Sequence, residues 1–230
     1  MGRQGGVSRN PDRPGSRRYL WRRTYGHRRV AGDLVENPKV GQRSRIVTLP
    51  GETGGRQFVI EYINRPFGGK NAVPSHVHTA YMETFEILRG RARYRLGSET
   101  KTAVAGERVT MPPLVPHVHP WSDSAEELHV RQIADANPSD LRGLNSGLQA
   151  AITLQGLARA GRVNTKGLPN LLQLGVLIET TMPATYLAGP PIAFQRVLFG
   201  GLGWMGRLAG YKTAYGEYGV ITARGPEKPR

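Results

Sequence analysis

The sequence predicts a mainly β protein, in which a barrel of short strands is preceded by a disordered basic arm and followed by a helical extension. Three observations lead to this fold class. Short segments of alternating apolar and polar residues, separated by Gly and Pro, run from Arg45 to about Ala134. After Pro138, apolar residues recur at helical spacing, and residues 1–30 show no hydrophobic periodicity at all. Regularly spaced short strands with turn signals favour a sandwich or a barrel, so we divide the chain into 1–30, 31–137 and 138–230.

The N-terminal arm, residues 1–30, carries nine arginines and a single acid, Asp12, and so contributes +8 to the net charge of +15. It is rich in Gly, Arg, Pro and Ser, and such a segment buries too little apolar surface to offset its ordering entropy. Three interpretations remain: a basic arm for nucleic acid or anionic lipid, a solvated tail without a role, or sequence upstream of a true start near Ala31. We expect neither nucleic acid nor a membrane as the partner.

The strands of the barrel are indicated by alternation and by turn residues. The segments "RIVTLP" and "QFVIEYINRP" flank "GETGG" and predict one hairpin. The segments "TFEILRG" and "RARYRLGS" predict a second hairpin that turns at Gly90. In the latter strand Ala92, Tyr94 and Leu96 share one face, and three arginines form what we expect to be a solvated outer face. The segments "TAVAGERVTMPP", "PHVHPW" and "ELHVRQIAD" complete the series.

Three helices are predicted after the strands. The first has Ser139 and Asp140 as cap candidates and Gly161 as its stop. The second lies in "LPNLLQLGVLIETTM", and the third lies in "PPIAFQRVLFGGLGWMGRLAGY", with proline at its start. Because no polar linker separates these helices from the strands, we expect them to pack on the barrel or to form a subunit interface.

Composition narrows the class of protein. The chain has no cysteine, which excludes disulfides and thiolate metal sites and fits a reducing compartment. It has neither an uncharged apolar run of about 18–20 residues, as a spanning helix needs, nor the apolar region of a secretory signal at its N-terminus. We therefore predict a cytoplasmic protein. A Walker A loop and a dinucleotide-binding glycine fingerprint are also absent.

The stretch "SHVHTAYMETFEILRG" suggests a buried metal site. His76 and His78 are two residues apart, so in a strand they point to the same face. Glu83 shares its parity with Phe85 and Ile87, which indicates that it also faces the core. A carboxylate in a dry interior is costly unless it is paired or bound to a cation.

A further candidate ligand follows in "GERVTMPPLVPHVHPW", where His117 comes after a strand and two prolines. Three histidines and one glutamate form a nitrogen and oxygen donor set that suits a divalent Fe, Mn, Ni, Co, Cu or Zn ion, and the sequence does not rank these metals. His119 shares the parity of His117. It is a candidate base or alternate ligand, with a position at the rim as the other interpretation.

These stretches resemble the two motifs of the cupin family. The first family motif runs Gly, spacer, His-x-His, three or four residues, Glu, six residues, Gly. This chain matches it with Gly69, His76, His78, Glu83 and Gly90, with a spacer one residue longer than usual. The resemblance covers roughly residues 36–136 and implies that His76, His78 and Glu83 bind a metal inside a jelly-roll barrel.

The second family motif runs Gly, five residues, Pro-x-Gly, two residues, His, three residues, Asn. This chain supplies Gly106, Pro112 and His117, with Leu114 in place of the second glycine and Trp121 in place of the asparagine. The resemblance thus adds His117 as the fourth ligand. The overall layout is similar to bacterial single-barrel cupins with a helical C-terminal extension.

From this resemblance and the residues we predict a metal-dependent enzyme that acts on a small organic molecule by oxygenation, isomerisation or cyclisation. Glu83 and His119 are the candidate catalytic residues. Whether the enzyme is an oxidoreductase stays open, because the cupin barrel carries many functions. The alternative is a non-catalytic cupin that binds a ligand or a metal in a regulatory role. We expect the protein to form a homodimer.

Overall fold

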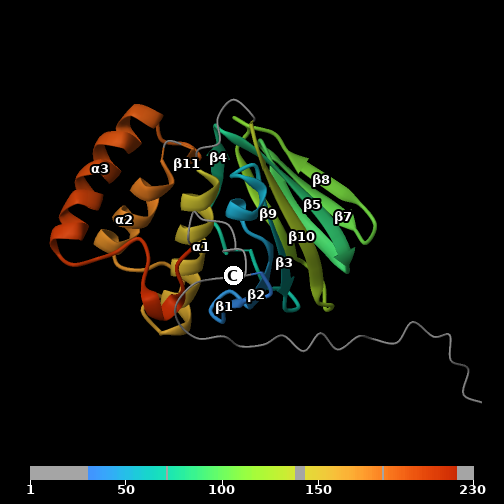
Figure 1. Cartoon of the computed structure of the whole chain (residues 1–230). Helices are drawn as coiled ribbons and strands as arrows, with labels where there is room; N and C mark the ends of the chain where they lie inside the picture. The colour runs from blue at the N-terminus through green and yellow to red at the C-terminus, as the bar shows by residue number, and fades with distance from the viewer. Residues whose placement is uncertain (1–30, 71, 138–142, 183, 222–230) are drawn as a thin grey trace, which may run out of the picture.

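The computed structural model of the protein describes residues 31–70, 72–137, 143–182 and 184–221. The arm at 1–30 and the cap candidates Ser139 and Asp140 lie outside these residues. The described chain forms two antiparallel sheets with three α-helices on one side of them (Figure 1). The prediction of a mainly β protein with C-terminal helices is confirmed.

The two sheets contain eleven strands among the described residues. The six-stranded sheet consists, in spatial order, of β1 (Leu34–Asn37), β2 (Gln42–Thr48), β3 (Gln57–Asn64), β10 (Leu128–Ala136), β5 (Tyr81–Arg89) and β8 (Arg108–Met111). The five-stranded sheet consists of β11 (Thr185–Leu187), β4 (His76–His78), β9 (His117–Ser122), β6 (Arg91–Leu96) and β7 (Glu99–Val104). Most spatial neighbours are distant in sequence, so the chain repeatedly passes from one sheet to the other.

The first predicted hairpin is confirmed, because β2 and β3 pair antiparallel and a short 3-10 helix, Pro50–Thr53, connects them. The second predicted hairpin is wrong. β5 pairs with β10 and β8, whereas β6 pairs with β7 and β9. Gly90 marks the point where the chain leaves one sheet for the other. It has φ +84°, and a Cβ there would approach the backbone oxygen of Glu127 to 2.6 Å, so the position requires glycine.

The barrel core lies between the sheets and consists of side chains from both. The buried members are Tyr62, Phe85, Ile87, Ala92, Ala103, Val109, Met111, Leu128 and Val130. Tyr94 and Leu96 pack against them, as alternation in this strand predicts, while the Arg91 and Arg93 side chains are about half exposed. Burial of a side chain the size of valine, leucine, isoleucine, methionine or phenylalanine contributes about 1.5–3 kcal/mol to stability.

The three predicted helices are present as α1 (Leu144–Arg159), α2 (Leu171–Thr181) and α3 (Ile192–Leu208). α1 packs against β1 and the neighbouring strands through Leu144, Leu148 and Ile152. α2 begins after Asn170, whose side chain accepts a hydrogen bond from the backbone N–H of Gln173. None of the helices in the described parts of the chain combines the length and the apolar character that a membrane crossing needs.

Strand β11 was not predicted, and it joins the helical extension to the barrel. It lies between α2 and α3 in sequence and pairs with β4, the strand that carries His76 and His78. Gln195 of α3 fixes the far end of β11, since its side chain bonds to both the backbone N–H and the backbone oxygen of Leu187. Residues Thr185–Leu187 therefore lie directly beside the candidate metal ligands on β4.

Candidate metal centre

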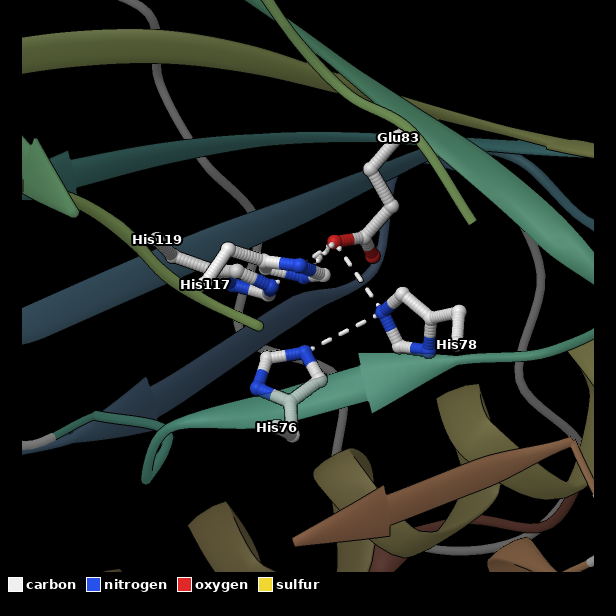
Figure 2. A group of neighbouring side chains, drawn as sticks. All are labelled: His76, His78, Glu83, His117 and His119. Atoms are coloured by element: carbon white, nitrogen blue, oxygen red, sulfur yellow. Dashed lines mark hydrogen bonds and ion pairs between the residues drawn. The ribbon is translucent and has the colours of Figure 1, made fainter. Parts of the chain in front are cut away.

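Five side chains converge between the two sheets (Figure 2). They are His76 and His78 from β4, Glu83 from β5, and His117 and His119 from β9. Their potential ligand atoms all lie within 4.8 Å of one another. Four of the residues are at most 3% exposed, whereas the His119 side chain is 16% exposed. The structure thus brings together all the site residues that the sequence indicates, from three strands and both sheets.

The Glu83 carboxylate is the centre of the group. Its Oε2 atom lies 3.2 Å from the Nε2 of His78, 3.4 Å from that of His117 and 2.8 Å from that of His119. The Nε2 atoms of His76 and His78 are 3.1 Å apart. Figure 2 shows the carboxylate pointing toward the imidazole rings from the opposite sheet.

Two histidines have their tautomer fixed by backbone carbonyls. The Nδ1 of His76 lies 2.7 Å from the oxygen of Pro74, and the Nδ1 of His117 lies 2.9 Å from the oxygen of Val115. A carbonyl oxygen only accepts hydrogen bonds, so each Nδ1–H donates and each Nε2 retains a lone pair that faces the group. This is the arrangement of a histidine prepared to bind a metal through Nε2.

Three further residues orient His78 and Glu83, and the sequence analysis missed all of them. His78 Nδ1 lies 2.9 Å from the Thr185 hydroxyl on β11, which also bonds to the Tyr81 hydroxyl at 3.0 Å. The Tyr81 ring stacks on His78 with 3.9 Å between centroids. Gln132 donates to Glu83 Oε1 at 2.6 Å, which leaves Oε2 free to face the histidines.

A divalent cation fits the chemistry of this group. Glu83 Oε2, His117 Nε2 and His119 Nε2 are buried and form no well-aligned hydrogen bond among the described residues, although the carboxylate oxygen lies 3.4 Å and 2.8 Å from the two nitrogens. An unsatisfied buried polar group costs about 1–3 kcal/mol, more if it is charged. With lone pairs from imidazole and carboxylate facing one another, a cation would satisfy several of these atoms together. The donors are nitrogen and oxygen only, which suits first-row divalent metals.

Burial and mutual contact also set the protonation states. Burial lowers the pKa of His76 well below its ordinary value, and the neighbouring histidines lower it further. Burial lowers the pKa of His78 too, although Glu83 opposes this. For Glu83, burial alone would raise the pKa, but His119 and His78 keep it well below its ordinary value. At neutral pH the group therefore combines a carboxylate with neutral imidazoles at His76 and His78, the forms that bind metals.

The second motif keeps its turn despite the loss of its glycine. Leu114 stands at that position and adopts φ +64°, a left-handed conformation that glycine takes without cost. Its backbone N–H donates to the oxygen of His78 at 2.7 Å, and its side chain is 67% exposed. The departure from the family pattern therefore leaves the turn beside β4 intact. His129, the other histidine of the strands, lies away from the group beside Glu127.

Comparisons with solved structures cover less than half of this chain. Neither the protein-family models nor the curated proteins contain a match to the chain. Solved structures that resemble it include the cupin domain of Cnp3 from Schizosaccharomyces pombe (TM-score 0.38, 10% identity, 46% of this chain and 69% of that chain). A predicted oxalate decarboxylase from Thermotoga maritima gives a TM-score of 0.40 at 13% identity, with 46% and 91% covered. The cupin domain of an XRE-family transcriptional regulator from Enterobacter cloacae gives 0.36 at 15% identity, with 42% and 98% covered.

Such low TM-scores and sequence identities do not indicate an activity. The chain's own features describe its fold. Two antiparallel sheets enclose the core, and the histidines and the glutamate of both motifs point into it. This arrangement agrees with the jelly-roll barrel that the resemblance of the two motifs implies.

Proposed function

We propose that the protein is a metal-dependent cupin enzyme that acts on a small organic molecule. His76, His78, Glu83 and His117 are the proposed ligands of one divalent metal. The observation that carries this proposal is the convergence of the four buried side chains between the sheets, with all their potential ligand atoms within 4.8 Å of one another. A cation at this point would satisfy lone pairs that the protein does not align with hydrogen-bond donors.

The donor set limits the metal to a class and does not select one member. Imidazole and carboxylate donors suit Fe, Mn, Ni, Co, Cu and Zn, and the absence of cysteine removes the thiolate donors of many structural zinc sites. Metal content of the purified protein, measured by elemental analysis, decides among these ions.

The proposed reaction is an oxygenation, an isomerisation or a cyclisation. A bound metal ion supplies Lewis acidity at the substrate and, for a redox-active ion, one-electron chemistry. Glu83 and His119 are the proposed proton carriers, because the His119 Nε2 and Glu83 Oε2 atoms lie 2.8 Å apart. His119 is also the most exposed of the five residues, so its ring is the one nearest to solvent for a proton exchange. The other four side chains of the group are at most 3% exposed, so water is largely excluded from them.

The first experiment compares the metal content of the wild type with that of a His76→Ala, His78→Ala double variant. His129→Ala serves as the control, because His129 lies outside the group. We expect about one metal ion per chain in the wild type and the control, and a much lower content in the double variant. Equal metal content in all three proteins would contradict the proposed centre. Thermal-shift screening of small organic molecules, followed by mass spectrometry of the mixtures, then tests for turnover.

One observation favours the alternative, a non-catalytic cupin that senses a ligand or a metal. Thr185 belongs to the helical extension and bonds to His78, so a change at the metal centre would be transmitted directly to β11 and from there to α3. A sensor would be stabilised by its ligand without forming a product. An enzyme would consume the stabilising molecule, and the same mass spectra distinguish the two.

A further inference from the structure

The outward face of α3 exposes a continuous apolar stripe. Its members recur three or four residues apart, so they lie on one side of the helix. They are Phe194 (57% exposed), Val197 (79%), Leu198 (40%), Trp204 (63%), Met205 (44%) and Leu208 (70%), and Gly201 lies at the middle of the stripe. We call this set the α3 stripe. No charged residue belongs to it.

The opposite face of α3 holds the helix in place. Gln195, Phe199, Gly203 and Gly206 are its buried residues. A Cβ at Gly206 would approach a side-chain carbon of Val176 on α2 to 2.6 Å, which shows how closely these two helices pack. In Figure 1, α3 is the outermost helix, with α2 between it and the rest of the molecule. The α3 stripe is therefore not needed to attach the helix to its own subunit.

The area of the stripe matches one half of a stable dimer interface. Aromatic side chains have areas of about 150–250 Å², and with the lower end of that range for the four aliphatic residues the six exposed fractions amount to roughly 600 Å². The largest apolar patch on a typical monomer is about 300–600 Å². A standard interface buries about 800 Å² on each partner, of which little more than half is apolar. The stripe thus supplies the whole apolar share.

The charges on α3 favour a protein partner over an anionic membrane surface. The helix has two charged residues, Arg196 and Arg207. Arg196 donates to the Tyr186 hydroxyl at 3.0 Å, and Arg207 forms an ion pair with Glu179, so both are engaged within the subunit. Helices that lie on anionic membranes carry basic residues free to meet the lipid. An uncharged stripe, by contrast, is complementary to itself and suits a two-fold contact, in which each subunit presents the same patch.

We propose that two copies of the protein associate through their α3 stripes, with the two α3 helices packed against each other across a two-fold axis. A Cβ built at Gly201 meets no other atom within 4 Å, so the position faces outward, and its lack of a side chain permits a close approach. The distance between packed helices is set by the side chains at their contact, so a glycine at the centre allows the larger neighbours on either side to interdigitate. This interface stands apart from the metal centre and does not depend on the proposed function.

The test measures the mass of the full-length chain in solution by light scattering after size-exclusion chromatography. We expect twice the chain mass for the wild type at micromolar concentration, and the mass of one chain for Val197→Glu. Val104→Glu is the control, because Val104 is an exposed valine too, at 48%, but lies on β7, away from α3. The circular dichroism of each variant verifies that it is folded. We expect the dimer dissociation constant to rise at least tenfold in Val197→Glu alone.

A crosslinking variant makes the test independent of disruption. The chain has no cysteine, so Gly201→Cys introduces its only thiol, and we expect mild oxidation to give a disulfide-linked dimer. Val104→Cys should give none. Two results would overturn the proposal: a monomeric wild type, or a dimer that Val197→Glu leaves intact.

Discussion

Replacing Thr185 by alanine tests whether the helical extension supports the metal centre. The Thr185 hydroxyl is shared by His78 Nδ1 at 2.9 Å and the Tyr81 hydroxyl at 3.0 Å. Alanine leaves His78 Nδ1 without this partner, at a cost of about 1–3 kcal/mol for a buried polar group. We expect the free energy of unfolding of the metal-free protein to fall by about 2 kcal/mol. In a chain of this length that corresponds to a decrease of about 4–8 °C in Tm.

Metal binding should weaken in the same variant. Residues that orient a ligand histidine typically account for about 10–100-fold in metal affinity, and the hydroxyl of Thr185 is the group that fixes the His78 ring from the side away from the centre. Thr185→Ser retains the hydroxyl and loses only a methyl group, so it should lose less than about 1 kcal/mol and keep its affinity. Urea denaturation of chelator-treated protein and competitive metal titration measure the two effects. If the alanine and serine variants behave alike in both assays, the reasoning is refuted.

Three further predictions concern the metal, a strained turn and a buried ion pair. Chelation should lower the Tm of the metal-loaded wild type by about 5–10 °C, since a metal at a hundred times its Kd adds about 2.7 kcal/mol; a scanning fluorimetry shift of the same size in the double histidine variant would contradict this. Leu114→Gly should raise the free energy of unfolding by about 0.5–1 kcal/mol, because glycine tolerates φ +64°; urea denaturation that shows a loss would instead mean that the leucine side chain is stabilising. Burial would raise the pKa of Glu61, but Arg131 and Arg45 lower it below 4.5, so its stabilising effect is present at neutral pH and lost as the pH falls below that value. Glu61→Gln should therefore cost about 1 kcal/mol at pH 7 and almost nothing near pH 3; an equal cost at both values would refute the assignment.

The positions of the candidate ligands could be predicted because they depend on local geometry. Alternation along a strand places Glu83 on the same side as Phe85 and Ile87, and these three residues are at most 2% exposed in the structure. The same rule places His76 and His78 together. The rule also applies to His119, whose Nε2 lies 2.8 Å from Glu83 Oε2. The roles of these residues as metal ligands and catalysts stay predictions.

The pairing of strands could not be predicted in the same way. Alternation shows which side of β5 and β6 faces inward, but it does not identify the neighbouring strand. Closeness in sequence across Gly90 therefore predicts a hairpin, whereas β5 pairs with β10 and β6 pairs with β9. β11 is three residues long and has too few positions to show a pattern. Thr185 was missed for that reason, because its role depends on a contact with a residue more than a hundred positions away. Gln132 could have been found, as a polar residue at an inward position between Val130 and Ala134. The division of the chain at residue 137, the cytoplasmic location and the homodimer stay predictions.

The late position of β11 determines when the centre can be completed during protein synthesis. All the proposed metal ligands have been translated by residue 117, yet the outer edge of β4 gains its neighbour β11 only after about another seventy residues have followed. A nascent chain that stops near residue 137 would carry His76 and His78 on a strand that pairs with β9 on one edge and is open on the other, and it would lack the hydroxyl behind His78. Attempts to express the barrel alone, or to graft it onto another protein, would therefore have to supply a replacement for the three residues of β11, Thr185–Leu187.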